Sequence, residues 1–235
     1  AHFNIGNTLQ GLERWEEAVP AYQQTIAVDP TYNLAQFHLG KTLLDSGDAA
    51  AAVTAFEALL RRTPDHVDGN LELADALEQT GRLDDAIVYF ERAVELAPRS
   101  ARAFNNYGIA LAKHGRADAI DKLKQALVIY PSYTKAHNNM RIAFIKSGDI
   151  EQANAYYATI LGADTGNVAR HYDYAFVLDM MGADRNAEIQ LRATLDIDPL
   201  HADAMTALGT LLIRTKRAPE GERMLQAAAK LGTGG

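Results

Sequence analysis

The 235-residue sequence contains no cysteine, which excludes disulfides and metal sites built on thiolates. Positive charge is also scarce, because 23 Lys and Arg stand against 30 Asp and Glu to give a net charge of −7. Phosphate recognition needs a basic surface, so this balance argues against a nucleic-acid partner. No run approaches the roughly 18 to 20 apolar residues of a membrane span, and the first residues lack a signal-peptide pattern. The compartment stays open between the cytoplasm and, where a signal has been removed, the periplasm.

Catalytic motifs are missing as well. The sequence has no His-Glu-x-x-His pair, no glycine-rich phosphate loop and no nucleophile elbow, so we expect neither an enzyme nor a cofactor or metal site. His137 and His171 are 34 residues apart and are expected to pack rather than to react. The other histidines show no clustering and are His2, His38, His66, His114 and His201.

The clearest pattern of a helical hairpin lies between residues 71 and 98. Two amphipathic patterns, separated by Gly81 and closed by Pro98, place small residues where two backbones must approach and leave Phe90 too large for one hairpin to cover. Such a hairpin needs neighbours, and the sequence supplies them. Pro30, Pro64 and Pro98 follow one another at intervals of 34 residues, as do Gly47, Gly81 and Gly115. A fixed period of this length predicts a repeat array.

The repeated pattern of small residue, Leu or aromatic, glycine, alanine, aromatic, alanine and proline resembles the tetratricopeptide repeat. The residues that carry it are Gly40, Leu43, Gly47, Ala52, Phe56 and Pro64 in one unit, and Ala74, Leu77, Gly81, Ala86, Phe90, Ala93 and Pro98 in the next. The resemblance implies an all-α, right-handed superhelical solenoid of antiparallel helix pairs. We expect one array over 1–235, with repeats at about 1–30, 31–64, 65–98, 99–131, 132–165, 166–199 and 200–231 and a flexible tail at 232–235.

Three repeats depart from the pattern. Repeat four is one residue short, and the deletion lies after Gly115, so a shortened turn between its helices is expected. Repeat five lacks the closing proline, which makes 162–167 the loosest joint of the array. Repeat seven has Lys216 where glycine is usual. The opening helix is short and uncapped, so we expect this chain to be a fragment of a longer protein.

In this family the first helix of each repeat lines the inner groove, so the resemblance implies that its exposed side chains meet the partner. We expect partner contacts from a set that includes polar, charged and aromatic residues. They are Phe37, His38, Lys41, Glu72, Asp75, Arg102, Asn105, Asn106, Lys113, Lys135, Asn138, Asn139, Lys146, Tyr172 and Phe176.

The most informative part of this set is a ladder of amides. Asn105 and Asn106 recur 33 residues later as Asn138 and Asn139, which is the length of the shortened repeat. Asparagine is a poor helix former, so two exposed pairs in mid-helix lower stability without helping the fold. An amide pairs a donor with an acceptor and suits the backbone of an extended peptide. The alternative is incidental polar surface, or contact with another part of a longer parent protein.

Charge suggests how such a partner would be oriented. Arg102, Lys113, Lys135 and Lys146 flank the amides and would attract acidic side chains. Glu72, Asp75 and Glu78, with Asp68 just before them, form an acidic block beside the amides, which would push an acidic segment toward repeats four and five. The three aromatics Phe37, Tyr172 and Phe176 would anchor apolar side chains.

Two subfamilies were compared with these residues. The two-carboxylate clamp of chaperone-binding members is rejected, because Asn106 and Lys135 match it but Asp75 would repel a carboxylate. The array also resembles the arm of O-linked N-acetylglucosamine transferases: Asn4, Asn106 and Asn139 match the inner asparagine ladder there, while the remaining positions do not. Those positions are His38, Glu72, Asp173 and Ala207.

The sequence therefore predicts a protein-interaction scaffold that binds a protein or peptide partner with an acidic segment in its inner groove. Two alternatives stay open: a substrate-selecting arm of a larger enzyme such as a glycosyltransferase, or a structural subunit of an envelope or secretion assembly that self-associates.

Overall fold

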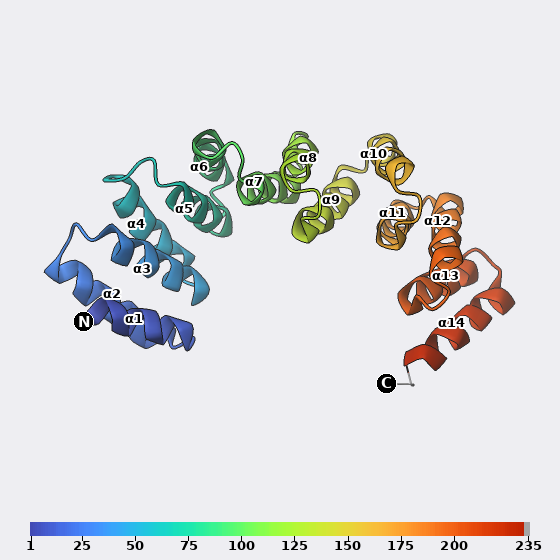
Figure 1. The fold of residues 1–235 in the computed structure, drawn as a ribbon, viewed down its shortest axis with the longest axis horizontal. Coiled ribbons are helices and arrows are strands. Elements are labelled where there is room, and N and C mark those ends of the chain that lie inside the picture. The colour runs from blue at the N-terminus through green and yellow to red at the C-terminus, as the bar shows by residue number, and fades with distance from the viewer. Residues whose placement is uncertain (233–235) are drawn as a thin grey trace. The chain divides into compact units, whose positions relative to one another are not determined.

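The computed structural model describes residues 1–232 and folds them into fourteen α-helices without a strand (Figure 1). The predicted all-α solenoid of helical repeats is confirmed. Gly232 ends the last helix, and the rest of the predicted flexible tail, 233–235, lies outside the described residues. The chain divides into two compact units, unit 1 at Ala1–Asn139 and unit 2 at Met140–Gly235, so the division falls within a helix. The prediction of a single array over the whole chain stays a prediction.

The helices alternate between first and second helices of the repeats. Those of unit 1 are α1 (His2–Gly11), α2 (Trp15–Val28), α3 (Asn33–Asp45), α4 (Ala49–Leu60), α5 (Val67–Gln79), α6 (Leu83–Leu96), α7 (Ala101–Lys113) and α8 (Ala119–Ile129). The division between the units falls inside α9 (Thr134–Ser147). Those of unit 2 are α10 (Ile150–Ala163), α11 (Val168–Met180), α12 (Asp184–Ile197), α13 (Ala202–Arg214) and α14 (Ala218–Gly232).

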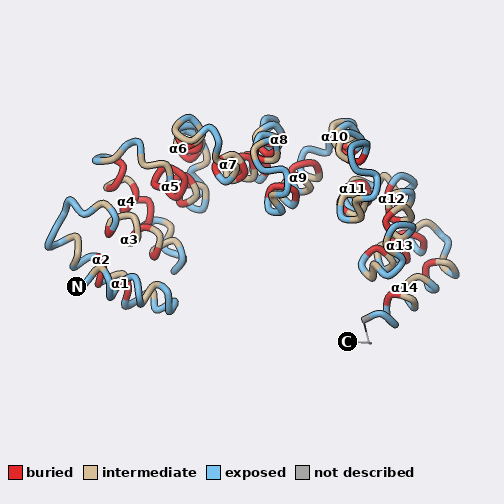
Figure 2. Tube along the Cα trace, in the orientation of Figure 1, coloured by how far each residue is buried: buried red, intermediate tan, exposed pale blue. Residues whose placement is uncertain are grey.

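Small residues on the first helices make room for large side chains on the second. Ala74 of α5 and Phe90 of α6 are both fully buried. In the preceding repeat the fit is tighter, because a Cβ added to Gly40 would lie 2.7 Å from the Phe56 ring. Buried residues gather between the first and second helices of unit 1, whereas the turns and the outer surfaces of second helices such as α2 and α6 are exposed (Figure 2). Each helix pair is therefore held by side chains that only a neighbouring helix can cover.

The turns between paired helices need a left-handed residue. Gly81, between α5 and α6, has φ +80°, a conformation that glycine adopts without steric penalty. Glu13 and Lys216 occupy the equivalent places in the first and last repeats with φ +57° and +65°. These two turns keep the geometry although their residues have side chains, so both carry backbone strain.

The missing residue of repeat four has an effect that differs from the prediction. Between Gly115 and α8 there are three residues, 116–118, whereas only Arg82 separates Gly81 from α6. Helix α8 has 11 residues, against 14 in α6. The prediction of a shortened turn is wrong. Because Ala119 and Leu123 must keep their places in the core, the chain shortens the first turn of the helix instead.

The joint after repeat five has no proline but does have hydrogen bonds. The carboxylate of Asp164 accepts from the Gly166 backbone N–H at 3.3 Å and from Asn167 Nδ2 at 3.0 Å. Asn167 in turn caps α11 by accepting from the Arg170 backbone N–H at 3.1 Å. Whether this is the loosest joint stays a prediction.

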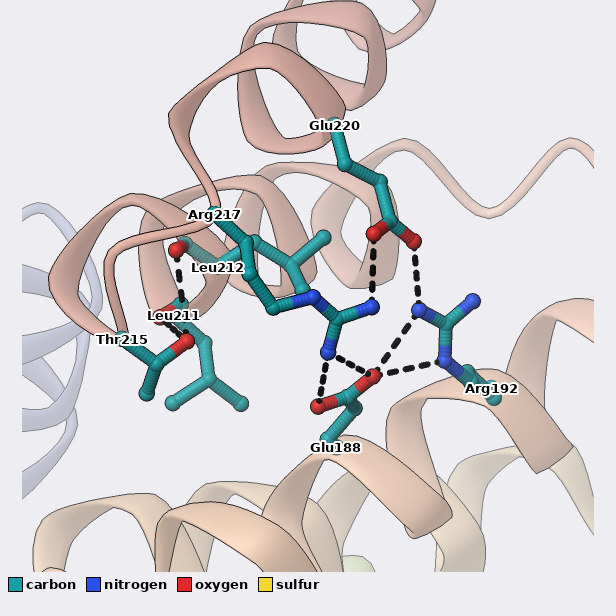
Figure 3. A network of polar contacts seen from close by, with 7 residues as sticks. All are labelled: Glu188, Arg192, Leu211, Leu212, Thr215, Arg217 and Glu220. Carbon is teal, nitrogen blue, oxygen red and sulfur yellow. Dashed lines mark hydrogen bonds and ion pairs between the residues drawn. The ribbon is translucent and has the colours of Figure 1, made fainter.

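The last two repeats are joined by a network of four charges that the sequence reading missed (Figure 3). Arg217 reaches both carboxylate oxygens of Glu188 at 2.9 Å and one oxygen of Glu220 at 2.6 Å. Arg192 contacts the same two acids, at 2.9 and 2.6 Å. The charges alternate in sign, so the network links α12 to the start of α14.

Candidate functional site: the first-helix faces

Three amide side chains of unit 1 form a continuous chain of hydrogen bonds. Asn139 Nδ2 on α9 donates to Asn105 Oδ1 on α7 at 2.8 Å. Asn105 Nδ2 donates to Asn106 Oδ1 at 3.2 Å, and Asn106 Nδ2 donates to the Asp75 carboxylate on α5 at 3.2 Å. The chain therefore spans three successive first helices and ends on a carboxyl group. We call these four residues the amide chain.

The predicted ladder of freely exposed amides is only partly right. Asn105 is buried, with 3% of its surface exposed, so its expected exposure is wrong. Asn106 and Asn139 are half-buried, and Asn138 is exposed. The residue equivalent to Asn105 in repeat three is Leu71, which is also buried. The apolar residue at the equivalent position therefore predicts that this position is buried. Asn105 stabilises the contact between repeats and is not available to a partner.

The basic residues of α7 are paired with the acidic residues of α5. Arg102 contacts Asp68 at 2.9 Å and also contacts Glu72, and Lys113 Nζ lies 3.0 Å from Glu78 Oε2. Glu72 is buried, so its expected exposure in the groove is also wrong. Two of these pairs, Asp68 with Arg102 and Glu78 with Lys113, are 34 and 35 residues apart on equivalent faces, a signal that predicts contact between repeats. Arg102 and Lys113 thus already have anionic partners within the chain.

Of the four carboxyl groups on α5, Asp75 is the one that contacts no cation within the described residues. The pKa of Asp75 is raised to about 7, chiefly by burial and also by the carboxylates of Glu72 and Glu78, while Arg102 and the hydrogen bond from Asn106 act in the opposite direction. Two of these groups flank Asp75 one turn away on its own helix. The α5 face is therefore sensitive to protonation near neutral pH.

Two side chains next to the amide chain remain open. Lys135 and Asn138 lie on α9 in unit 1, and both are exposed. In the part of the chain that the structure describes, neither side chain has a hydrogen bond or an ion pair. Together with the half-buried amides of Asn106 and Asn139, they form a polar surface with one unneutralised positive charge.

The residues expected at the start of the groove pack against their neighbours. The Phe37 ring stacks on His66 at a centroid distance of 5.2 Å and meets Phe56 at 6.0 Å, so it is not a free anchor for a partner. His38 is half-buried, stacks on Tyr22 and lies 3.1 Å from Gln10 Oε1. Burial lowers the pKa of His38, as does the nearby Lys41.

In unit 2 the first-helix face combines charged and apolar side chains. Arg141 Nη1 on α9 contacts Asp173 on α11 at 2.7 Å, and its guanidinium lies 4.8 Å from the centre of the Phe176 ring. Tyr172 is half-buried against His201, with ring centres 4.9 Å apart. Phe176 and Lys146 are exposed, as expected. Of the three predicted aromatic anchors, Phe176 is the one whose surface is available.

Four histidine side chains make polar contacts at the connections between repeats. His137 Nε2 lies 2.8 Å from the Pro131 carbonyl oxygen, and His171 Nε2 lies 3.1 Å from that of Thr165. These contacts fit the packing role expected for the pair. His66 and His201 cap α5 and α13 by accepting a backbone N–H through Nδ1. Among residues 1–232, no three His, Asp or Glu side chains gather in a way that could hold a metal ion.

A separate cavity of about 480 Å³ lies on the other side of unit 1, between α4 and α6. Its lining joins apolar and charged side chains and consists of Glu57, Leu60, Arg61, Pro64, Asn70, Val88, Tyr89 and Arg92. The sequence reading did not include this surface, because it followed the first helices alone.

A family model described as a tetratricopeptide repeat matches the chain three times, over residues 3–64, 37–100 and 71–134. These matches together span more than half of the chain. The chain belongs to the tetratricopeptide repeat family. Repeats of this family indicate a protein–protein interaction scaffold. No helix within residues 1–232 is both long enough and apolar enough to cross a membrane.

Solved structures of tetratricopeptide repeat proteins share the fold at low sequence identity. A protein from Parabacteroides merdae has a TM-score of 0.64 and 11% identity, with 99% of this chain and 93% of that chain covered. PilW, described as a widely conserved type IV pilus biogenesis factor, has a TM-score of 0.54 and 21% identity, with 86% and 95% covered. Both similarities concern the fold alone.

A curated relative matches a shorter stretch. The Protein CTR9 homolog of Arabidopsis thaliana is 32% identical over 90 residues, which is 38% of this chain and 8% of that protein. The chain thus spans a small part of the relative's length.

Proposed function

We propose that this tetratricopeptide repeat protein is a scaffold that holds a segment of a partner protein against the first-helix face of unit 1, at Asn106, Lys135, Asn138 and Asn139. The observation that carries the proposal is the amide chain and its free edge. Asn139 is fixed by one hydrogen bond, to Asn105 at 2.8 Å, and Asn106 is fixed by two, from Asn105 and to Asp75, both at 3.2 Å. Asn138 and Lys135 beside them have no partner in the described chain.

A primary amide has two donor hydrogens and an oxygen with two lone pairs, so one or two hydrogen bonds leave at least half of its capacity unused. The bonds within the amide chain hold the amides of Asn106 and Asn139 in place before a ligand arrives. A partner backbone would therefore meet donors and acceptors whose side-chain entropy has already been lost. Mid-helix asparagines lower helix stability, and the exposed side chain of Asn138 makes no hydrogen bond within the described residues that would offset this effect.

Fewer positive charges are available to a partner than the sequence suggested. Arg102 and Lys113 face the acids of α5, so their charge is not available to a partner. Among the described residues, Lys135 is the cation beside the amides that has no ion pair. A partner segment that places one carboxylate opposite Lys135 therefore fits this surface better than a uniformly acidic segment.

A selection from a random twelve-residue peptide library on the full chain tests the proposal. Recovered peptides are synthesised, and their affinities for the wild type and for a Lys135→Ala, Asn138→Ala variant are measured by fluorescence anisotropy. The lost hydrogen bond and charge contact should together weaken binding by about 5- to 30-fold. Gln125→Ala on α8 is the matched control and should leave affinity unchanged. Equal binding of every recovered peptide by the double variant and the wild type would refute the proposal.

A further inference from the structure

Four large apolar side chains of unit 2 are exposed on its first helices. They are Ile142 on α9, Phe176 and Met180 on α11, and Ile213 on α13, each between 38% and 57% exposed. Phe176 and Met180 are one turn apart on the same face of α11. Ile142 occupies the place of Phe176 one repeat earlier. We call these four residues the Phe176 patch.

Arg141 stands at an unusual place beside this patch. The equivalent residues of the other hairpins are glycine or alanine, such as Gly40, Ala74 and Ala175, because the second helix packs closely there. In repeat five an arginine takes that place, and its Nε is buried without a hydrogen-bond partner. A buried donor without a partner lowers stability, so packing alone does not account for this residue. The guanidinium of Arg141 lies over the Phe176 ring, 4.8 Å from the ring centre, and this contact holds the ring in place.

The charges around the patch are unevenly distributed. On the α9 side, Arg141 and Arg170 share the single carboxylate of Asp173, at 2.7 and 3.0 Å. Lys146, one turn after Ile142, is exposed and has no ion pair in the described chain. On the α13 side, Arg214 is already held by two carboxylates, those of Asp179 and Asp184. Positive charge is thus in excess along α9.

We infer that the Phe176 patch binds a partner segment that carries a large apolar side chain next to a carboxylate. The apolar side chain would cover Phe176 and Met180, and the carboxylate would face Lys146. This inference rests on the proposed function, the binding of partner segments on the first-helix faces, and names the partner chemistry that unit 2 selects. It concerns residues of unit 2 alone, so it is independent of the amide chain.

The experiment uses the full chain with Lys135→Ala and Asn138→Ala, so that the surface proposed in unit 1 is removed. A random twelve-residue peptide library is selected on this protein. We expect recovered peptides to share a Leu, Ile, Phe or Met within four positions of an Asp or Glu. Their affinities are then measured on this background with Met180→Ser or Lys146→Glu added, and circular dichroism checks that each variant is folded.

Each added change should weaken binding at least tenfold. Val128→Ser, which changes an exposed apolar residue of α8 in unit 1, is the control and should alter affinity less than twofold. Recovery of no peptide, of peptides without the pairing, or of peptides indifferent to both changes would overturn the inference. If light scattering shows that the chain self-associates and that Met180→Ser abolishes this, the patch binds a second copy of the chain, and the inference is also overturned. The unit 1 proposal stands or falls on its own variant, so the two failures are separable.

Discussion

Asn139 on α9 donates a hydrogen bond to Asn105 on α7 across 2.8 Å, and the accepting residue is buried. Two asparagines separated by one repeat thus differ in role: the inner one stabilises the joint, and the outer one keeps hydrogen-bonding capacity for a ligand. Replacing the asparagines therefore has two separable effects, one on folding and one on binding.

Asn105→Ala tests the first effect. It removes two hydrogen bonds within the amide chain and leaves the half-buried amide of Asn139 without its acceptor. We expect a loss of about 1 to 3 kcal/mol in the free energy of unfolding, measured by urea denaturation. Asn138→Ala, at an exposed place without contacts, is the control and should change stability by less than about 0.5 kcal/mol. Equal stabilities of the two variants would contradict the structural role of Asn105.

Asp75 makes the stability of unit 1 depend on pH. A carboxyl group whose pKa is raised in the folded chain, here from 3.8 to about 7, binds its proton more tightly in the folded than in the unfolded state. Its contribution to stability is therefore greatest at low pH, falls as the pH rises from about 4 through about 7, and is constant above.

The Asp75→Asn variant keeps an acceptor for Asn106 and removes the charge. It should be more stable than the wild type by about 1 to 2 kcal/mol at pH 8 and by less than about half of that gain at pH 5, measured by urea denaturation at the two pH values. Glu16→Gln, at an exposed place on α2, should show the same difference from the wild type at both. A gain of stability at pH 5 that matches the gain at pH 8 would exclude titration of Asp75 as the cause.

The strained turns of the first and last repeats offer a gain in stability. Glu13 and Lys216 have φ +57° and +65°, and glycine adopts this conformation without the clash of a Cβ. Glu13→Gly and Lys216→Gly should each stabilise the chain by about 0.5 to 1 kcal/mol, seen as a higher midpoint of urea unfolding. In the opposite direction, Gly81→Ala at φ +80° should destabilise it by about 1 kcal/mol. If glycine stabilises neither terminal turn, the strain is absent.

Packing between paired helices predicts opposite effects for two other glycines. A Cβ on Gly40 would lie 2.7 Å from the Phe56 ring, so Gly40→Ala should cost about 1 to 3 kcal/mol of stability. Gly162 in α10 has no atom within 4 Å of an added Cβ. Gly162→Ala should therefore be neutral or stabilising by up to about 1 kcal/mol, since alanine is the better helix former. Thermal unfolding of the two variants compares them directly, and a similar loss in both would contradict the packing described.

The charge network of the last two repeats should depend on salt. Glu188→Gln removes the acid that both Arg192 and Arg217 contact, so it should lower the melting temperature at low ionic strength. The difference from the wild type should shrink in 1 M NaCl, because exposed charges are screened. Glu17→Gln removes a single exposed pair with Arg14 and should change little. An effect of Glu188→Gln that is independent of salt would point to packing instead of charge.

The fold was predictable because its signal is periodic. Gly81 and its equivalents mark the turns, and Ala74 opposite Phe90 marks the close approach of two helices, so the spacing alone placed the helix pairs. The consequence of the deletion in repeat four was not predictable from spacing. The repeat spacing indicates that a residue is missing after Gly115, but the burial of Ala119 decides that the helix, and not the turn, becomes shorter.

The sequence predicted which residues lie on the candidate site but not which of them contact one another. The sequence placed Arg102, Asp75 and Asn106 on one face, yet each was interpreted as facing a ligand. Opposite charges one repeat apart, such as Asp68 and Arg102, were the available signal that some charged residues of this face form ion pairs with each other. The position of the Arg141 guanidinium on Phe176 depends on side-chain conformation, which no spacing reveals.

Nuclear magnetic resonance of the asparagine side-chain amides tests the central claim most directly. A peptide recovered by selection on the wild type is titrated into the full chain, and the side-chain amide signals of Asn106, Asn138 and Asn139 are followed. The proposal predicts that all three shift and saturate with the same affinity as binding measured by anisotropy, while Gln125 on α8 does not move. Binding that leaves these three signals in place and shifts residues of the second helices would contradict the account.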